Sequence, residues 1–133
     1  MKLKSNPKSV DLTTRVLKSL PRGFVFTAKV TTSSMNPALR LGSLIRVKRV
    51  SIREVNRGDI VMFGMPGQRL PVVHRVLDKI NRNSVTCLKT KGDAAAAVDP
   101  GLVSPRNFLG KVIGRTHRST GIVAKLKQFL NLG

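Results

Sequence analysis

The chain has 133 residues and a mass of 14.5 kDa, enough for one modest hydrophobic core and too little for two ordinary domains. Lys and Arg number 25 against six Asp and Glu, a formal net charge of +19, yet 41% of the residues are hydrophobic, which excludes a disordered basic tail. The single Cys87 excludes an internal disulfide, and with only His74 and His117 we expect no structural metal and no cofactor.

The first predicted element is a short helix over residues 10–20, within a basic N-terminal segment, 1–23. Apolar residues recur there at approximate helical spacing, and Pro21 and Gly23 end the pattern. Charged residues interrupt the apolar ones, and no uninterrupted apolar stretch of about 18 residues occurs anywhere in the chain. We therefore expect neither a secretory signal nor a transmembrane helix, and a cytoplasmic protein by default.

Six β-rich segments follow the helix. Residues 24–32 alternate apolar with mostly polar side chains, which is the period of a half-buried strand. Little helical pattern lies between the segments, so we predict a mainly β domain over residues 24–116, either a small barrel or a folded sheet. The other five predicted strands are 41–50, 59–63, 72–77, 84–90 and 109–115, and the turns and loops between them include 33–37, 64–69, 81–83 and 91–101.

The last predicted element is an amphipathic helix in the basic C-terminal segment, 117–133, where apolar residues fall at helical spacing after Gly121. Basic amphipathic helices at both ends of a chain are typical of a surface that lies on anionic lipid. The alternative is that each helix packs its apolar stripe on the β core.

Two polar residues stand where catalysis would need them. Ser34 lies at the junction of a strand and the turn that Pro37 enforces, so its hydroxyl is exposed on a rigid neighbour, as a nucleophile requires. His74 lies within an apolar strand, where its ring needs a partner, and a neutral imidazole can take a proton from a serine hydroxyl. The alternatives are ordinary turn chemistry for Ser34 and a backbone hydrogen bond for His74, while His117 fits a solvated surface position.

Carboxylates are scarce, so each can be weighed. Asp93 and Asp99 bracket a loop of four alanines, and either is free to approach His74 or to pair with one of the many cations. The others fit caps, turns and strand ends: Asp11, Glu54, Asp59 and Asp78.

Five ordered blocks of the sequence resemble type I signal peptidases. The resemblance covers roughly residues 24–115 and is closest to the histidine-containing branch found in the endoplasmic reticulum, archaea and some bacteria. It implies the mainly β fold that signal peptidases share with self-cleaving repressors. The blocks are Ser34-Met35-Asn36-Pro37, Gly58-Asp59-Ile60-Val61, Val73-His74-Arg75-Val76, Lys91-Gly92-Asp93 with Asp99, and Gly110-Lys111-Val112.

The resemblance implies a role for each matching residue. Ser34 matches the nucleophile, His74 the general base, and Asp99 the acid that orients the histidine, with Asp93 as the second choice. The Ser34 N–H and the Thr32 hydroxyl match the donors to the oxyanion. The expected function is therefore a serine endopeptidase that resembles signal peptidase I and cleaves after small residues through an acyl-enzyme.

The resemblance also implies how a substrate binds. An extended peptide adds as a strand beside residues 25–31, and its small side chains fill shallow pockets, for which Phe26, Val30 and Met62 are the candidate lining residues. The chain departs from the family at Gly42-Ser43, where aspartate usually follows the glycine, and at Ala94-Ala95, where asparagines often stand. We also expect no membrane anchor of the usual kind in this sequence, and a membrane-anchored partner is one candidate source of it.

Three other functions remain open on the sequence. A net charge of +19 favours nonspecific binding of nucleic acid, but the chain has no Trp or Tyr and five Phe for stacking on bases. Self-cleaving repressor peptidases use lysine where this chain has His74, and they carry a DNA-binding domain for which residues 1–23 leave no room. A catalytically inactive binding protein on a peptidase fold is the third alternative.

Overall fold

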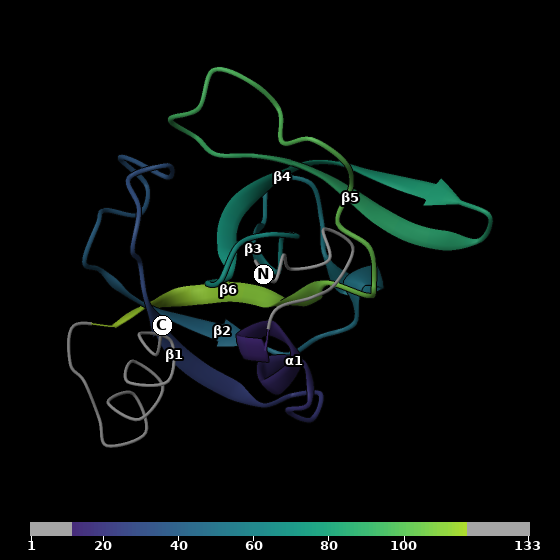
Figure 1. Cartoon of the computed structure of the whole chain (residues 1–133), viewed down its shortest axis with the longest axis horizontal. Coiled ribbons are helices and arrows are strands. Elements are labelled where there is room, and N and C mark those ends of the chain that lie inside the picture. Colours follow the sequence, from purple (N-terminus) through teal and green to yellow (C-terminus); the bar gives the residue numbers. More distant parts are fainter. Residues whose placement is uncertain (1–11, 117–133) are drawn as a thin grey trace, which may run out of the picture.

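The computed structural model describes residues 12–116, which form one open antiparallel sheet (Figure 1). Its order is β1-β2-β6-β3-β4-β5, so β1 and β5 are the two edges and the sheet is not closed into a barrel. The mainly β prediction is confirmed, in its folded-sheet form. The strands are β1 (Val25–Lys29), β2 (Leu44–Lys48), β3 (Ile60–Phe63), β4 (Val72–Arg82), β5 (Val85–Lys91) and β6 (Phe108–Thr116).

The described residues include one α-helix, α1 (Leu12–Lys18), which lies within the range predicted for the N-terminal helix. Its buried residues are Thr13, Thr14 and Leu17, whereas Leu12 and Val16 are exposed. The helix therefore rests on a face that is partly threonine. The helix approaches the loop after β3 closely at this face, because Thr14 packs directly against Gly64. A Cβ at Gly64 would lie 2.6 Å from Thr14 side-chain atoms, so only small groups fit between the helix and this loop. None of the helices in residues 12–116 has the length and apolarity needed to span a membrane, and the predicted C-terminal helix lies outside these residues.

Two clusters of buried side chains hold the sheet together. The first joins Leu17 of α1 to β1, β2 and the start of β6, with Phe26, Ile45 and Leu109 each 1% exposed or less. The second lies around β3 to β5 and includes Phe63. Strand β6 bridges the two clusters because it pairs with β2 on one side and β3 on the other. The last strand in the sequence thus lies in the middle of the sheet.

The β4–β5 hairpin is longer than the sequence pattern predicts. Strand β4 continues to Arg82, and the turn is formed by Asn83 and Ser84, both with positive φ, as in the tight two-residue turns of hairpins. Residues 77–82 are mostly exposed, so no alternation of apolar and polar side chains marks this half of the strand. The hairpin projects beyond the rest of the sheet (Figure 1). A 3-10 helix, η1 (Ile52–Glu54), was also not predicted; a capping box between Ser51 and Glu54 holds it.

Candidate active site

Ser34 lies just beyond the end of β1, and the core fixes its position. Its neighbour Met35 is 1% exposed and anchors the turn in the first buried cluster. The Ser34 carbonyl accepts a hydrogen bond of 2.8 Å from the Ala94 N–H, and the Asp93 N–H lies 3.3 Å from the Met35 Sδ. The serine turn and the loop after β5 are therefore tied together, although about 60 residues separate them in sequence.

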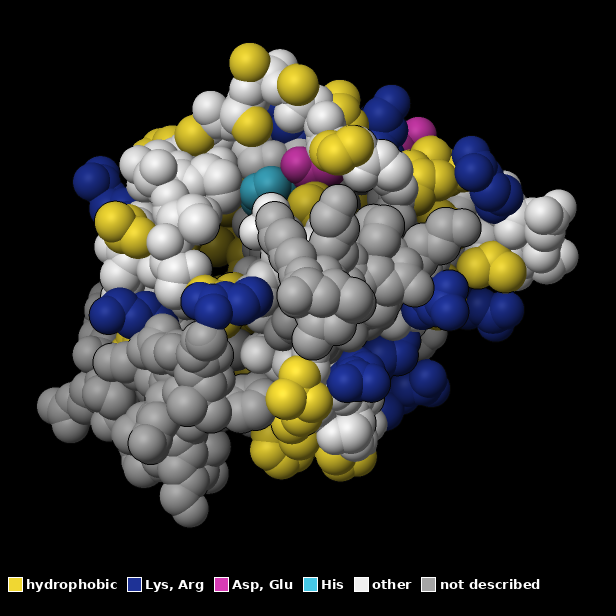
Figure 2. All heavy atoms as spheres, viewed as in Figure 1, with side chains coloured by type: hydrophobic (Ala, Val, Ile, Leu, Met, Phe, Trp, Pro, Cys, Tyr) yellow, Lys and Arg dark blue, Asp and Glu magenta, His cyan; other side chains and the backbone are white. Residues whose placement is uncertain are grey.

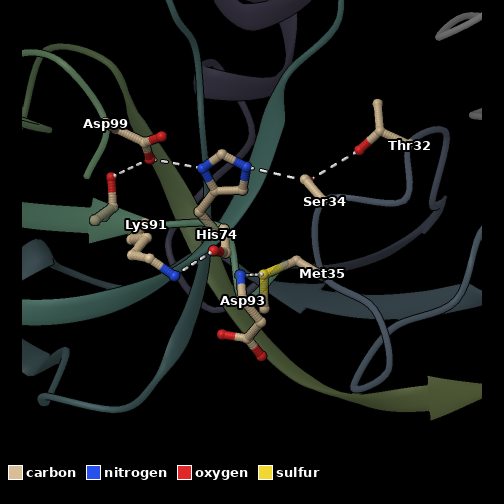
Figure 3. A network of polar contacts seen from close by, with 9 residues as sticks. Thr32, Ser34, Met35, His74, Lys91, Asp93 and Asp99 are labelled. Carbon is tan, nitrogen blue, oxygen red and sulfur yellow. Dashed lines mark hydrogen bonds and ion pairs between the residues drawn. The ribbon is translucent and has the colours of Figure 1, made fainter. Parts of the chain in front are cut away.

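His74 lies on β4, where it is paired with Val61 of β3, and its ring points toward Ser34. The distance from its Nε2 to the Ser34 Oγ is 3.1 Å (Figure 3). The ring also meets the Phe63 ring edge-on, with centroids 6.1 Å apart. The paired strand and this aromatic contact hold the imidazole in place, and only 12% of its side chain is exposed.

Asp99 lies on the other side of the imidazole. Its Oδ2 is 2.6 Å from the His74 Nδ1 and also accepts a hydrogen bond of 2.7 Å from the Thr90 hydroxyl. Thr90 is 1% exposed, and its carbonyl accepts from the Asp99 N–H, so the same residue holds both the backbone and the carboxylate of Asp99.

The donors in this row can be assigned from chemistry. An ionised carboxylate can only accept, so the His74 Nδ1 carries the proton that faces Asp99. The Nε2 of the neutral ring is then free to accept from the Ser34 hydroxyl. The Thr32 hydroxyl lies 3.0 Å from the Ser34 Oγ and donates to it in this arrangement. The result is a directed row from Thr32 through Ser34 and His74 to Asp99 (Figure 3).

Asp93, the second choice for the acid, pairs with another residue. Its two carboxylate oxygens accept from Arg75 at 2.9 and 2.8 Å, and Arg75 also donates to the Gly58 carbonyl. The hydrogen bond from Arg75 holds the pKa of Asp93 below its ordinary value. Arg75 follows His74 on β4, so this pair braces the strand of the histidine against the loop that carries Asp99.

Asp93→Asn should lower the thermal stability of the protein in a way that depends on pH. The folded pKa of Asp93 is lowered, so its pairing with Arg75 contributes stability above the ordinary value of 3.8 and loses it as the pH falls through the lower folded pKa. We expect a loss of about 1 kcal/mol near neutral pH, since the pair is partly exposed. Thermal unfolding of both proteins should show melting temperatures that converge below pH 3.8. A difference in melting temperature that stays constant with pH would contradict this. Asp78→Asn is the control, because within residues 12–116 the Asp78 carboxylate accepts only from the neighbouring Lys79 N–H.

Gly92 lies where the serine turn and the histidine come closest. A Cβ at this position would be 2.8 Å from the Ser34 carbonyl oxygen and 3.1 Å from the His74 Nε2. Only glycine permits this approach, because even a methyl group would push Ser34 and His74 apart.

We expect Gly92→Ala to reduce kcat/KM for peptide cleavage about 100-fold. The added methyl group would displace Ser34 and His74, and small displacements of reacting groups from their alignment slow the reaction strongly. Gly114→Ala is the matched control: a Cβ there has nothing within 4 Å, and no positive φ is present. Steady-state assays of the two variants make the comparison. Equal activity in both would show that the spacing at Gly92 does not matter.

A groove of about 750 Å³ runs beside Ser34, His74 and Asp99. Val30 and Met62, two of the three candidate pocket residues, line it together with Ala28 and Leu39. Phe26 is not among the lining residues; it is 1% exposed within the first buried cluster. Alternation along β1 cannot show which inward-facing side chains reach a groove and which end in the core. Within residues 12–116, no three or more His, Cys, Asp or Glu side chains gather as a metal site would require.

Sequence reasoning missed three residues of this site. Thr90 holds Asp99, Arg75 holds Asp93, and Gly92 allows the serine and histidine to meet. Arg75 and Gly92 lie inside two of the sequence blocks that resemble signal peptidases. The resemblance could therefore have pointed to both residues, but it does not give the physical reason for either. Nothing in the sequence singles out Thr90, since a threonine in a strand is ordinary.

A hydroxyl, an imidazole and a carboxylate in a row beside a groove form the arrangement that serine hydrolases use. A family model described as signal peptidase, peptidase S26, matches residues 12–80, a range that includes Ser34 and His74 and ends before Asp99. The chain belongs to this peptidase S26 family, and the predicted resemblance is confirmed.

Named relatives come from bacteria and fungi. Signal peptidase I W of Bacillus subtilis is 36% identical over 107 residues, which cover 79% of this chain and 56% of that protein. The signal peptidase complex catalytic subunit SEC11 of Chaetomium globosum is 34% identical over 93 residues, 64% of this chain and 54% of that protein. SEC11 of Scheffersomyces stipitis is 32% identical over 101 residues, 76% of this chain and 57% of that protein. The chain thus spans little more than half the length of each.

Proposed function

We propose that this protein is a serine endopeptidase of the signal peptidase I type, which cleaves proteins after small residues. One observation carries the proposal: the Ser34 hydroxyl, the His74 ring and the Asp99 carboxylate form a continuous hydrogen-bonded row at the wall of a groove. Family membership supports the same reaction, because the relatives are named as signal peptidases.

The reaction starts at Ser34. Its Oγ attacks the carbonyl carbon of the scissile peptide while its proton passes to the His74 Nε2, and the Asp99 carboxylate stabilises the imidazolium that forms. The tetrahedral intermediate then expels the amine, which leaves with the proton from His74. A water molecule, deprotonated by His74, next attacks the acyl-enzyme and releases the new carboxylate and a free Ser34 hydroxyl.

Two donors are proposed for the oxyanion. Within residues 12–116 the Ser34 N–H donates to no backbone carbonyl, so it is available to the substrate oxygen. The Thr32 hydroxyl now faces the Ser34 Oγ at 3.0 Å and needs only to rotate to reach an oxygen bound beside it. Thr32 would thus change partner as the negative charge develops.

We propose that the substrate binds as an extended strand beside β1. This strand is an edge of the sheet, so its outer backbone groups are not paired with another described strand. Ala28 of β1 and Val30, which directly follows the strand, line the groove and leave room for small side chains of a signal peptide. Met62 lies in the wall of the same groove.

We also propose peripheral contact with an anionic membrane surface, by way of the basic terminal segments, 1–23 and 117–133. The SEC11 relatives are named as catalytic subunits of a complex, so a membrane-anchored partner subunit is the proposed companion of this chain. Nonspecific nucleic-acid binding rests on the net charge of +19 alone, and no feature of the groove favours it.

Product mapping tests the proposed specificity. The full chain is incubated with a signal-peptide substrate that carries an Ala-x-Ala site, with and without anionic liposomes, and the products are identified by mass spectrometry. We expect cleavage after the second alanine and no cleavage of the matched peptide with Phe-x-Phe at the same site. Equal cleavage of both peptides would contradict the small-residue specificity, and an absence of cleavage in every condition would contradict the function.

A further inference from the structure

A second cavity, of about 400 Å³, lies away from the proposed active site. It shares no lining residue with the groove beside Ser34. The groove begins at the Ala28 end of the β1–β2 pair, whereas this cavity lies at the other end, where Arg49 follows β2 and forms hydrogen bonds with residues 23 and 24. Residues at the tip of the β4–β5 hairpin also line it, among them Ser84 and Thr86.

The lining of this cavity is strongly basic. Lys18, Arg22, Arg49 and Arg53 all line it, and no Asp or Glu does. Lys and Arg side chains are spread over the face shown in Figure 2, so charge alone does not distinguish the cavity. Its distinguishing feature is that two of these cations are partly buried and fixed in position.

Backbone carbonyls hold the two partly buried cations. Lys18 donates to the carbonyls of Pro105 and Arg106, and Arg49 donates to those of Lys18, Leu20 and Leu109. These bonds satisfy hydrogen-bonding groups but neutralise no charge. Burial, followed by the nearby cations Arg49 and Arg106, lowers the pKa of Lys18, and burial, followed by Arg22, lowers the pKa of Arg49.

No described carboxylate lines this cavity. The Glu54 carboxylate accepts the N–H of Ser51, which does line the cavity, and this bond is part of the cap of η1. Neither Arg22 nor Arg53 forms an ion pair with any carboxylate in residues 12–116. The other four described carboxylates are engaged elsewhere. Asp59 pairs with Lys111, Asp93 with Arg75 and Asp99 with His74. The Asp78 carboxylate accepts from the Lys79 N–H.

We propose that this cavity binds a phosphate group, either as free phosphate or as the head group of an anionic lipid. Lys18 and Arg49 form a fixed floor, and the exposed Arg22 and Arg53, with the Ser84 hydroxyl, complete the set of donors. Guanidinium groups match the geometry of phosphate oxygens and donate two bonds at once. A bound anion would relieve the mutual repulsion of these cations, which is the physical reason for binding.

The test uses the full chain and a pair of double variants. Arg22→Gln with Arg53→Gln removes two charges from the cavity without touching the carbonyl contacts of Lys18 and Arg49. Arg40→Gln with Arg46→Gln removes two exposed charges that line neither cavity nor groove and is the matched control. Thermal unfolding of all three proteins checks that the fold is retained.

Inorganic phosphate is titrated calorimetrically in a phosphate-free buffer, and sedimentation compares vesicles of phosphatidylglycerol with vesicles of phosphatidylcholine. We expect saturable binding to the wild type, at least about tenfold weaker in the cavity variant and changed by no more than about twofold in the control. Binding of inorganic phosphate supports a site for the free anion, and cavity-dependent binding of phosphatidylglycerol vesicles alone supports the lipid head group. Equal losses in both double variants, or no saturable binding of either probe, would overturn the proposal. Ser34→Ala should bind as the wild type does, so the outcome is independent of the peptidase activity.

Discussion

Ser34→Ala abolishes peptide cleavage in our expectation, with a loss in kcat/KM of at least about 1,000-fold. Without the hydroxyl no acyl-enzyme can form, and whatever rate remains comes from binding and oxyanion donors alone. Among the described residues, the Ser34 side chain forms hydrogen bonds with the Thr32 hydroxyl and the His74 ring alone, so its removal should leave the fold intact. The same mass-spectrometric assay measures the loss, with thermal unfolding as the check on folding.

Ser33→Ala is the matched control for this experiment. Ser33 is the adjacent serine and is exposed, whereas the side chain within hydrogen-bond distance of the His74 Nε2 is that of Ser34. We expect its activity to stay within about twofold of the wild type. If Ser34→Ala cleaves as fast as Ser33→Ala, Ser34 is not the nucleophile.

The second large effect is expected at His74 and its acid. His74→Ala should cost at least about 1,000-fold in kcat/KM, because Ser34 then loses the group that takes its proton. Asp99→Asn should cost a similar factor, since an amide in place of the carboxylate favours the wrong ring tautomer and does not stabilise an imidazolium. His74→Gln, a larger replacement, guards against an effect of the space left beside Phe63.

Double variants separate Asp99 from Asp93. Once His74 is absent, Asp99→Asn should reduce the remaining activity by no more than about threefold, because residues that act as a unit are not additive. Asp93→Asn acts through Arg75 and the loop, so its smaller effect should persist in the His74→Ala background. If Asp93→Asn becomes silent there and Asp99→Asn does not, the roles of the two carboxylates are exchanged.

Local patterns determine most of the strands. Alternation of apolar and polar side chains predicts β1 and β2, because one face of each is buried. Short apolar runs predict β3 and the first half of β4, where neither face is exposed. The same rule fails for residues 77–82, which extend β4 into an exposed ribbon. Neither face of this ribbon packs on the core, so its side chains show no periodic pattern. The basic composition predicts a positively charged surface but does not place the basic cavity.

Only the tertiary structure decides the order of the strands and the partners of the acids. Strand β6 pairs between β2 and β3 through contacts between residues far apart in the chain. The periodicity of a local segment carries no information about such contacts. Asp93 and Asp99 look alike in sequence; folding places Arg75 beside the first, and His74 and Thr90 beside the second. Ser34 and His74 can be named as candidates from their blocks, but 40 residues separate them, and their contact depends on the close approach that Gly92 permits. Sequence thus determines which chemical groups the chain carries and which local elements they occupy, while distances between those groups come from packing, because packing acts between residues that the chain does not join.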